Sequence, residues 1–390
     1  MNEISLSNHN TSNNKPIVVI FIITGLGTGG AEVMLYQLLT KINKQRFQAS
    51  VVSLMDYGTF GIPLENLGIT VYSLGMKRGV PTPNTFRQLM KIVNEVKPDV
   101  IQGWMYHGNL AAYFANLFSS NPSHVYWSIH HSIKSLELEK SMTRVIIRVC
   151  GYFSRFIAKT IFVSKNSKLQ HEAIGYSCEN SCVIPNGFDV LSFQPSVESR
   201  LKFRKELNLS KDCILIGLMC RFHPMKDHLN FLNASVLLSQ KFPDVKFVLA
   251  GTNVDNKNDF LLDKIKQLGL EDKTYLLGER QDIPNIIPAL DIMTMASAYG
   301  EAFPLIVGES MSCGVPCVVT DVGDASWIVG DTGKVVPPRN PEALADAWQE
   351  LIAMDMEARD KLGIAARSRV INSFSLDSIV SKYEHLYESC

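Results

Sequence analysis

The chain has 390 residues, 46% of them hydrophobic and 19% charged, and its formal net charge at pH 7 is zero. This composition is typical of a folded protein of two ordinary domains and argues against extensive disorder. The zero net charge excludes a general attraction for nucleic acid, so an anion site has to be local and no nucleic-acid partner is expected. The longest apolar runs, residues 17–23 and 213–220, are too short to span a bilayer.

The first 15 residues, MNEISLSNHNTSNNK, are polar and rich in Asn and Ser. They contain neither an apolar segment nor a cleavage site for export, so we expect residues 1–15 to be a disordered leader and the protein to be cytoplasmic. Two pairs of cysteines are closely spaced, Cys178/Cys182 and Cys313/Cys317. Both lack the nearby histidine or second pair that a zinc site needs. Reduced thiols and no metal site are therefore expected.

From residue 16 onward, short apolar segments rich in β-branched residues alternate with helical patterns. The first six such segments cover residues 17–23, 49–54, 69–74, 99–104, 124–129 and 160–164. Strands of this composition are buried on both faces, and their alternation with helices predicts a parallel sheet covered on both sides. A first Rossmann-like domain should span residues 16–190.

Turn-forming residues in VIPNGFD, residues 183–189, interrupt this pattern, and a polar stretch follows. The alternation then resumes, with apolar segments at residues 213–220, 245–251, 274–278, 291–297 and 315–321. A second Rossmann-like domain should span residues 200–372, and a final helix within 373–390 should cross back to the first domain. The expected fold is α/β, with two Rossmann-like domains facing each other across a cleft. Ligands of such sheets bind beyond the carboxyl ends of the strands.

The glycine-rich stretch GLGTGG, residues 25–30, follows the first strand and opens a helix. Backbone N–H groups at such a helix start can hold a phosphate. Taken as G-x-G-x-x-G, with Asp56 after the next strand as the acid that binds a ribose, the motif predicts an NAD(P)-dependent oxidoreductase. Another phosphate site, or a tight turn that needs small residues, explains the motif equally well.

Two cations, Arg221 and Lys226, follow the first strand of the second domain in the sequence RFHPMKDH. Their place at the carboxyl end of a strand suits a diphosphate, because Arg can engage oxygens in a fork and Lys acts as a point charge. Taken alone, such a pair is more often two solvated surface cations.

Two carboxylates, Glu301 and Glu309, flank Pro304 in SAYGEAFPLIVGES. Proline is tolerated at the first position of a helix, which predicts a helix starting near Pro304, with Glu301 before it and Glu309 on its second turn. The N-terminus of that helix could hold a phosphate, and the carboxylates could accept hydrogen bonds from a sugar and a ribose. With the two cations on the same rim, these features indicate a nucleotide-sugar site.

The motifs GLGTGGAEV, VSKNS, VIPNGFD, RFHPMKDH, EAFPLIVGES and TGKVVPP, in this order, resemble those of the retaining GT-B glycosyltransferases of family 4, or glycosyltransferase group 1. The likeness covers most of the chain. It implies transfer of a hexose or N-acetylhexosamine from a nucleotide sugar, with a UDP-sugar the expected donor. The acceptor would be a glycan or a lipid-linked sugar in the synthesis of a cell-surface polysaccharide or glycolipid. The nucleotide sugar is a substrate, so no cofactor is implied, and the absence of a D-x-D motif predicts that no metal is needed.

The resemblance also implies the roles of individual residues. Arg221 and Lys226 would bind the diphosphate of the donor, and Glu301 would bind the hydroxyls of its sugar. His130, in WSIHHS, would lie beside that sugar, although the neighbouring His131 is an alternative.

Glu309 would bind the ribose, and His107 is a candidate residue on the acceptor side. The remaining donor contacts are expected from the glycine-rich helix start, from the backbone before the helix that carries Glu309, and from the segment GERQD beside the nucleobase. The residues concerned are Gly29, Gly30, Phe303, Pro304, Leu305 and Arg280.

Residues 140–159 place Arg144, Arg148, Arg155 and Lys159 at helical spacing with apolar residues between them. A basic amphipathic helix can lie on an anionic membrane, so a peripheral contact at the inner face of the membrane is one expectation. A helix packed on its own sheet with a solvated basic face explains the pattern equally well.

Three other functions are open besides the glycosyltransferase. The oxidoreductase leaves the two cations and the paired glutamates of the second domain unexplained. A nucleotide-sugar epimerase of GT-B-like fold would need acid and base residues that the sequence does not identify. A protein that binds a nucleotide sugar without catalysis differs only in activity.

Overall fold

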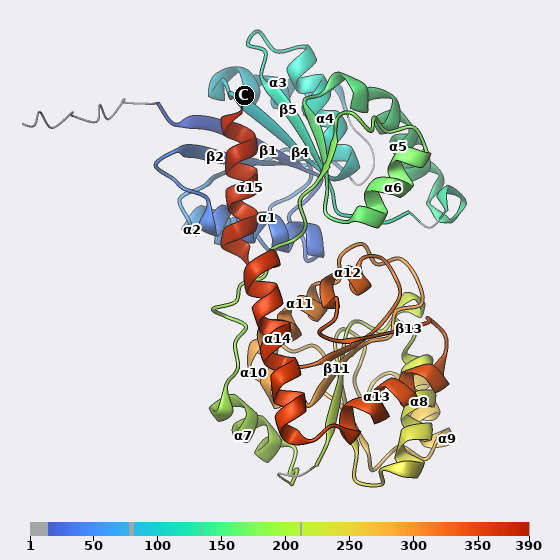
Figure 1. Cartoon of the computed structure of the whole chain (residues 1–390). Coiled ribbons are helices and arrows are strands. Elements are labelled where there is room, and N and C mark those ends of the chain that lie inside the picture. Colours follow the sequence, from blue (N-terminus) through green and yellow to red (C-terminus); the bar gives the residue numbers. More distant parts are fainter. Residues whose placement is uncertain (1–14, 78–81, 134, 211–212, 390) are drawn as a thin grey trace, which may run out of the picture.

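The structure, a computed structural model, describes residues 15–77, 82–133, 135–210 and 213–389. Figure 1 shows two α/β domains, one above the other, with helices α14 and α15 running along one side of both. The expected leader lies outside the described residues apart from Lys15. Within the described residues no helix is both long and apolar enough to cross a membrane.

The first domain is built on a sheet of seven parallel strands in the order β3-β2-β1-β4-β5-β6-β7. Strand β1 pairs with β2 on one side and β4 on the other, so that Ile20 lies opposite Ser50 and Ile101. Strands β2 and β3 are added on one side of β1, and β4 to β7 on the other, so the strand order reverses between β1 and β4. The loops that follow the two strands at such a switch point diverge and leave room for a ligand. The strands are β1 Ile17–Ile23, β2 Phe47–Ser53, β3 Thr70–Ser73, β4 Val100–Trp104, β5 His124–Ile129, β6 Lys159–Phe162 and β7 Ser181–Val183.

Helices cover both faces of this sheet, as the buried strands require. Two short 3-10 turns, Leu136–Leu138 and Ser154–Phe156, flank the fifth helix. The helices of this domain are α1 Gly30–Lys41, α2 Gly61–Asn66, α3 Pro83–Val96, α4 Met105–Leu117, α5 Ser141–Phe153 and α6 Lys165–Ala173.

The second domain repeats this plan with six parallel strands in the order β10-β9-β8-β11-β12-β13. Here the strand order reverses between β8 and β11, so the loops that follow these two strands lie on either side of the switch point. The strands are β8 Leu215–Met219, β9 Lys246–Ala250, β10 Thr274–Leu276, β11 Ile292–Met295, β12 Cys317–Thr320 and β13 Lys334–Val336. The helices are α7 Val197–Glu206, α8 His228–Lys241, α9 Asp259–Gln267, α10 Ile283–Ile286, α11 Leu305–Ser312, α12 Ala325–Val329, α13 Pro341–Ala353 and α14 Met356–Phe374, with 3-10 turns at Pro224–Lys226 and Ile287–Ala289. The last helix of the chain, α15 Leu376–Glu388, follows α14.

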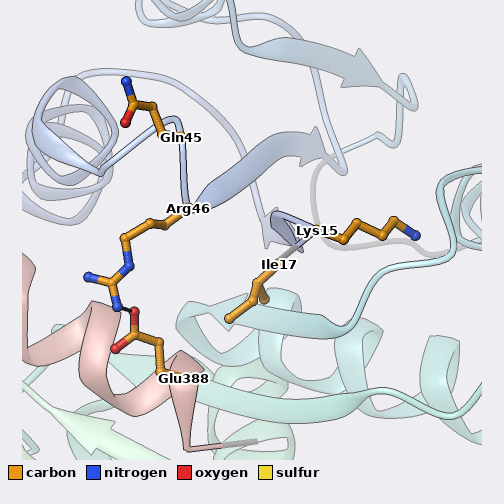
Figure 2. A pocket seen from close by; sticks show the side chains of 5 residues that line it. All are labelled: Lys15, Ile17, Gln45, Arg46 and Glu388. Atoms are coloured by element: carbon orange, nitrogen blue, oxygen red, sulfur yellow. Dashed lines mark ion pairs between the residues drawn. The ribbon is translucent and has the colours of Figure 1, made fainter. Parts of the chain in front are cut away.

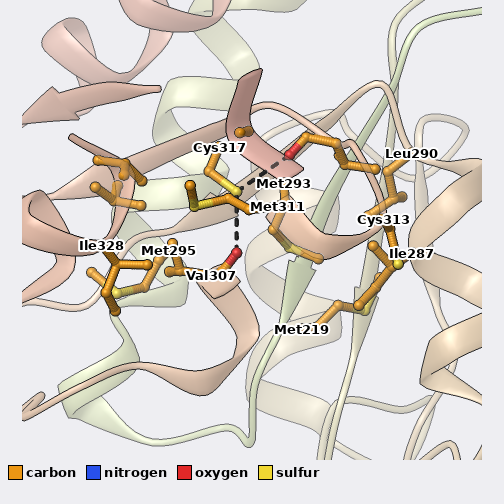
Figure 3. Close-up of a cluster of buried hydrophobic side chains, with 14 of the residues drawn as sticks. Met219, Ile287, Leu290, Met293, Met295, Val307, Met311, Cys313, Cys317 and Ile328 are labelled. Carbon is orange, nitrogen blue, oxygen red and sulfur yellow. Dashed lines mark hydrogen bonds between the residues drawn. The ribbon is translucent and has the colours of Figure 1, made fainter. Parts of the chain in front are cut away.

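A methionine-rich core fixes helix α11 on the second sheet (Figure 3). Val307 and Met311 of this helix are fully buried, and they pack in one cluster with Met293 and Met295 of β11. Burying side chains of this size stabilises the fold by about 1.5–3 kcal/mol each. This packing aims the N-terminus of α11 at the rim where β8 and β11 end.

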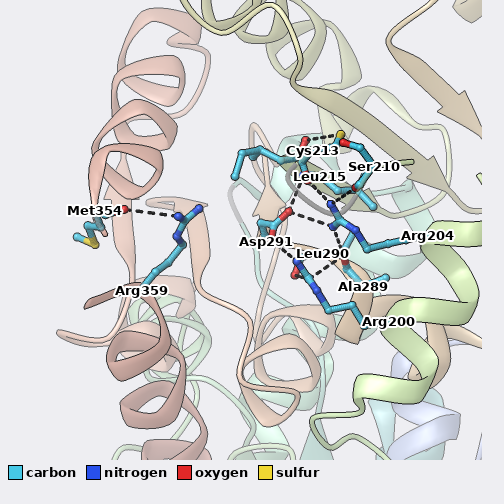
Figure 4. Close-up of polar contacts among 11 residues, drawn as sticks. Arg200, Arg204, Ser210, Cys213, Leu215, Ala289, Leu290, Asp291, Met354 and Arg359 are labelled. Atoms are coloured by element: carbon cyan, nitrogen blue, oxygen red, sulfur yellow. Dashed lines mark hydrogen bonds and ion pairs between the residues drawn. The ribbon is translucent and has the colours of Figure 1, made fainter. Parts of the chain in front are cut away.

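An aspartate anchors the linker helix α7 to the start of β11 (Figure 4). Asp291 accepts hydrogen bonds from Arg200 at 2.7 Å, from Arg204 at 3.3 Å and from the backbone N–H of Leu215 at 2.7 Å. The carboxylate therefore joins the linker to both strands at the switch point.

The C-terminal helix α15 lies on the first domain. Its buried residues, including Ile379, Tyr383 and Tyr387, belong to the core around β1 and α1. Glu388 near its end pairs with Arg46, as Figure 2 shows at the edge of a pocket lined by Lys15, Ile17, Gln45, Arg46 and Glu388. The last helix thus crosses from the second domain to the first.

The structure corrects two details of the sequence analysis. The basic helix expected over residues 140–159 ends at Phe153, and Lys159 opens strand β6. The edge strands β7 and β13 were not predicted. Each has three residues, which is too short for a periodic pattern, and pairing with β6 or β12 defines it.

Candidate active site

The start of helix α11 faces the start of helix α1 in the other domain. Pro304 is the N-cap of α11 in an extended conformation, and Leu305 is the first helical residue. Among the described residues no side chain caps this helix, so its first N–H groups can meet a ligand. A Cβ atom at Gly30, the first residue of α1, would lie 3.9 Å from Cδ1 of Leu305. Two helix N-termini, which in general favour an anion, therefore lie close together, with the Glu32 carboxylate beside the start of α1.

The loops after β8 and β11 are joined to each other. Lys226 forms an ion pair with Glu301, whose Oε1 also accepts a hydrogen bond from Ser297 Oγ at 2.6 Å. The backbone N–H of Ala298 donates to the carbonyl of Met225 at 2.8 Å. The side chains of Lys226 and Glu301 are 18% and 10% exposed. The structure thus brings together a cation and a carboxylate that the sequence analysis assigned to one site.

Arg221 follows the end of β8 and is exposed. Within the described part of the chain it forms no ion pair. Its loop is held by the backbone N–H of Phe222, which donates to Thr252 at 2.9 Å. The loop also packs closely against Gly251, where a Cβ atom would lie 2.3 Å from the carbonyl oxygen of Cys220. The guanidinium is therefore free to bind an anion at a fixed strand end.

Glu309 lies on the second turn of α11, as expected, and is half-buried. Desolvation raises the pKa of its carboxyl group to about 7. Among the described residues nothing donates a hydrogen bond to this carboxylate. A desolvated acid without a donor favours its neutral form, and a ligand hydroxyl that donates to it would favour the charged form.

In the first domain the ring of His131 is already engaged. Its Nε2 lies 2.8 Å from Glu139 Oε1. The ring of His130 instead stacks on Trp104, with ring centroids 4.7 Å apart, and the side chain of Asn186 lies beside it. Burial lowers the pKa of His130 to about 3, so its ring is neutral. Trp104 donates to the carbonyl of Ala31 at 2.9 Å, which links His130 to the start of α1.

The remaining expected residues lie in different surroundings. Arg280 is engaged by Asp282 at 2.7 Å and by Glu206 at 3.0 Å, and these hydrogen bonds raise its pKa. Its side chain therefore reaches a nucleobase only if these pairs open. Phe303 is 5% exposed and stacks on Phe188, so only its backbone is available to a ligand.

Three further positions lie in the first domain. Gly29 is the N-cap of α1 and lies beside Glu32. His107 lies in the first turn of α4, where burial lowers its pKa. Asp56, the acid of the oxidoreductase hypothesis, is exposed and lies after β2. Within the described residues no group of three or more His, Cys, Asp or Glu side chains is placed to hold a metal ion.

Two residues of this region were missed from the sequence. Ser297 supports Glu301 from four residues upstream, a spacing that carries no signal in a loop. Asp324 lies at the start of α12, where an acid before a short helix suggests a cap, yet its carboxylate binds the other domain. Both depend on contacts between loops, which local patterns do not contain.

Two family models match the chain, one for each domain. Residues 28–190 match the model of Glycosyltransferase Family 4, and residues 199–369 match that of Glycosyl transferases group 1. With the two facing α/β domains, these matches define a glycosyltransferase of the GT-B fold. The chain belongs to glycosyltransferase group 1. Membership of glycosyltransferase group 1 and the GT-B fold class, both expected from the sequence, are thereby confirmed.

Curated relatives match parts of the chain. A UDP-Gal:alpha-D-GlcNAc-diphosphoundecaprenol alpha-1,3-galactosyltransferase of Escherichia coli is 27% identical over 209 residues, 53% of this chain and 53% of the relative. The lipopolysaccharide core mannosyltransferase LpsB of Rhizobium meliloti is 28% identical over 53% of this chain and 60% of its own length. The chain thus matches only about half of these relatives.

Among solved structures, HepE of Anabaena in complex with UDP has a TM-score of 0.84 and 23% identity, covering 96% of this chain and 100% of its own. The same protein in complex with UDP-glucose has a TM-score of 0.81 and 24% identity, covering 96% of this chain and 100% of its own. At 23% and 24% identity, the similarity to these two structures establishes the fold alone.

Proposed function

We propose that the protein is a retaining glycosyltransferase that moves a hexose or N-acetylhexosamine from a UDP-sugar to a glycan or lipid-linked acceptor. The observation that carries this proposal is the joining of Lys226 and Glu301 beside the N-terminus of α11, opposite Gly30. Cation, helix ends and carboxylate together suit a diphosphate bonded to a sugar. The group 1 relatives favour this function over an oxidoreductase, and no observation favours an epimerase.

Transfer breaks the bond between C1 of the sugar and the phosphate oxygen and forms a bond from C1 to the acceptor oxygen. Negative charge develops on the departing diphosphate, and preorganised donors there are the largest catalytic term expected. Arg221, Lys226 and the N-termini of α1 and α11 would supply them. The leaving phosphate would take the proton of the acceptor hydroxyl, with attack on the face that it leaves.

On this proposal Glu301 accepts hydrogen bonds from the donor sugar and Glu309 from the ribose. The ion pair with Lys226 places Glu301 next to the diphosphate. His130, held neutral by burial, contributes as a hydrogen-bonding group and not as a cation. No metal or other cofactor takes part in this scheme, so EDTA should leave the activity unchanged.

For the acceptor side we propose His107 and a peripheral contact of helix α5 with an anionic membrane at the cytoplasmic face. Alongside the basic side chains, Met142, Val145, Tyr152 and Phe156 are each at least 55% exposed. Basic and apolar side chains on one exposed surface favour the interface of an anionic bilayer. Flotation with anionic vesicles at low salt should retain the protein, and exchanging Tyr152 and Phe156 for Ser should release it.

The decisive test is ligand specificity followed by turnover. Thermal-shift measurements with UDP, GDP, ADP and NAD(P) should show stabilisation by UDP, about 2.7 kcal/mol at a hundredfold excess over its dissociation constant. A panel of UDP-sugars with a lipid-linked sugar acceptor should then release UDP, and proton NMR of the product should show the anomeric configuration of the donor. Stabilisation by NAD(P) alone would refute the proposal, and an inverted product would refute retention.

A further inference from the structure

One buried carboxylate of the second domain caps a helix of the first. Asp324 precedes α12 and is 4% exposed. Its Oδ2 accepts a hydrogen bond from the backbone N–H of Lys165 at 2.5 Å, and its Oδ1 accepts one from Asn166 at 3.1 Å. These two residues are the first of α6. The contact therefore crosses the boundary between the domains.

Helix α6 needs this cap because its own N-cap satisfies only one N–H group. Ser164 accepts a hydrogen bond from the N–H of Ser167 at 3.1 Å. The first N–H groups of a helix have no partner within it, and a carboxylate suits them both as an acceptor and as a negative charge. If the domains separated, the carboxylate and both N–H groups would have to be hydrated instead. The Nζ atom of Lys165, 4.1 Å from the centroid of the Trp327 ring, adds a second contact across the boundary.

Asp324 is attached to the loop that carries Glu301. Its backbone N–H donates to the carbonyl of Ala302 at 3.0 Å. The preceding Gly323 has a φ of +63°, and a Cβ atom there would lie 2.3 Å from the carbonyl oxygen of Glu301. The two loops are thus in contact through their backbones, and a displacement of Asp324 displaces Glu301.

Helix α6 is attached in turn to the loop that carries His130. Ser167 Oγ donates to the carbonyl of His131 at 2.5 Å. Gln170 Oε1 accepts from the backbone N–H of Ile133 at 2.8 Å. The Asp324 carboxylate is therefore the link between the loop of Glu301 in one domain and the loop of His130 in the other.

We propose that Asp324 is an interdomain latch that closes the two domains and positions the Glu301 loop against the His130 loop. It is a positioning residue, since it reaches the donor site only through these loops. Its effect on turnover rests on the proposed transferase function, whereas its effect on domain closure does not.

Four variants separate the latch from a general loss of stability. Asp324→Asn keeps the shape of the side chain but leaves one acceptor oxygen for two N–H donors. Lys165→Pro removes one donor at the first helical position, where proline is tolerated, and Lys165→Ala is its control for the lost side chain. Asp355→Asn is the matched control for a capping aspartate, because Asp355 accepts from Ala358 at 2.7 Å within the second domain.

Amide hydrogen exchange and solution X-ray scattering of the unliganded full chain measure the protection of the capped amides and the closure of the domains. In Asp324→Asn we expect the amides of residues 165 and 166 to exchange at least about tenfold faster and the radius of gyration to increase. Lys165→Pro should increase the radius of gyration more than Lys165→Ala, which removes only the contact with Trp327, and Asp355→Asn should match the wild type. Unprotected amides in the wild type, or an Asp324→Asn variant that matches Asp355→Asn, would overturn the latch.

Turnover tests the positioning role. Asp324→Asn should lower kcat about tenfold, or about 1.4 kcal/mol in the barrier, while the dissociation constant of UDP changes less than about threefold. An unchanged kcat in an opened protein would overturn the positioning role. If the wild type transferred no sugar at all, the exchange and scattering results would still decide on the latch, and the transferase proposal would fail by itself.

Discussion

Glu309 offers a sharp test of the site, because the structure places a destabilising carboxylate there. Desolvation raises its pKa from the model-compound value of 4.5 to about 7. At about 1.4 kcal/mol per pH unit, the native state is penalised by about 3 kcal/mol once the group is ionised. Glu309→Gln removes the charge and keeps the shape of the side chain.

The sign of the effect follows from the direction of the shift. At a pH below 4.5 the carboxyl group is protonated in both states and contributes nothing. Between pH 4.5 and about 7 the unfolded state loses its proton first, so the free energy of unfolding falls as the pH rises. The stabilisation by Glu309→Gln should therefore grow from near zero at about pH 4 to about 3 kcal/mol at about pH 8.

Urea unfolding of the unliganded protein across this pH range measures the difference, with the exposed Glu342→Gln as the control for a change of charge. UDP should act in the opposite direction. A ribose hydroxyl that donates to Glu309 lowers its pKa, so calorimetry at about pH 7 in buffers of different ionisation enthalpy should show proton release on binding. This release should be absent in Glu309→Gln, which should also bind UDP more weakly.

Two results would refute this reasoning. A stability difference between Glu309→Gln and the wild type that does not change with pH would show that the carboxyl group is not desolvated. Equal UDP affinity and equal proton release in both proteins would show that the ribose does not contact Glu309.

Three other substitutions test the donor site. Arg221→Ala should change the free energy of unfolding by less than about 0.5 kcal/mol, since the residue is exposed. It should weaken UDP binding tenfold or more, because a hydrogen bond to a charged group contributes about 1.5–3 kcal/mol. An unchanged dissociation constant of UDP by calorimetry would contradict its role. Lys226→Met should lower the free energy of unfolding by about 1–3 kcal/mol, because it leaves the Glu301 carboxylate unpaired, and Glu301→Gln added to it should restore part of the loss in urea. Gly30→Ala should keep the melting temperature, since its Cβ atom would only touch Leu305, yet lower kcat/KM at least tenfold; a lower melting temperature would assign the glycine to packing.

The sequence alone predicted most of the fold because buried parallel strands and covering helices have different periods. It also predicted which loops follow the strands, and hence that Arg221, Lys226 and Glu301 lie at one edge of a sheet. Proline and the spacing of the two glutamates predicted the start of α11 to within one residue. The three-residue strands β7 and β13 and the end of α5 lay beyond local patterns, because pairing with neighbouring strands defines them.

The tertiary structure decided how the predicted residues are used. Lys226 pairs with Glu301 from 75 residues away, and Asp324 caps a helix that begins 159 residues before it. His131 is engaged by Glu139 whereas the ring of His130 stacks on Trp104, and burial alone gives Glu309 its raised pKa. Local sequence patterns reach across a few residues of one helix or strand. Contacts between loops, and the desolvation that they cause, exist only after the two sheets have folded and met.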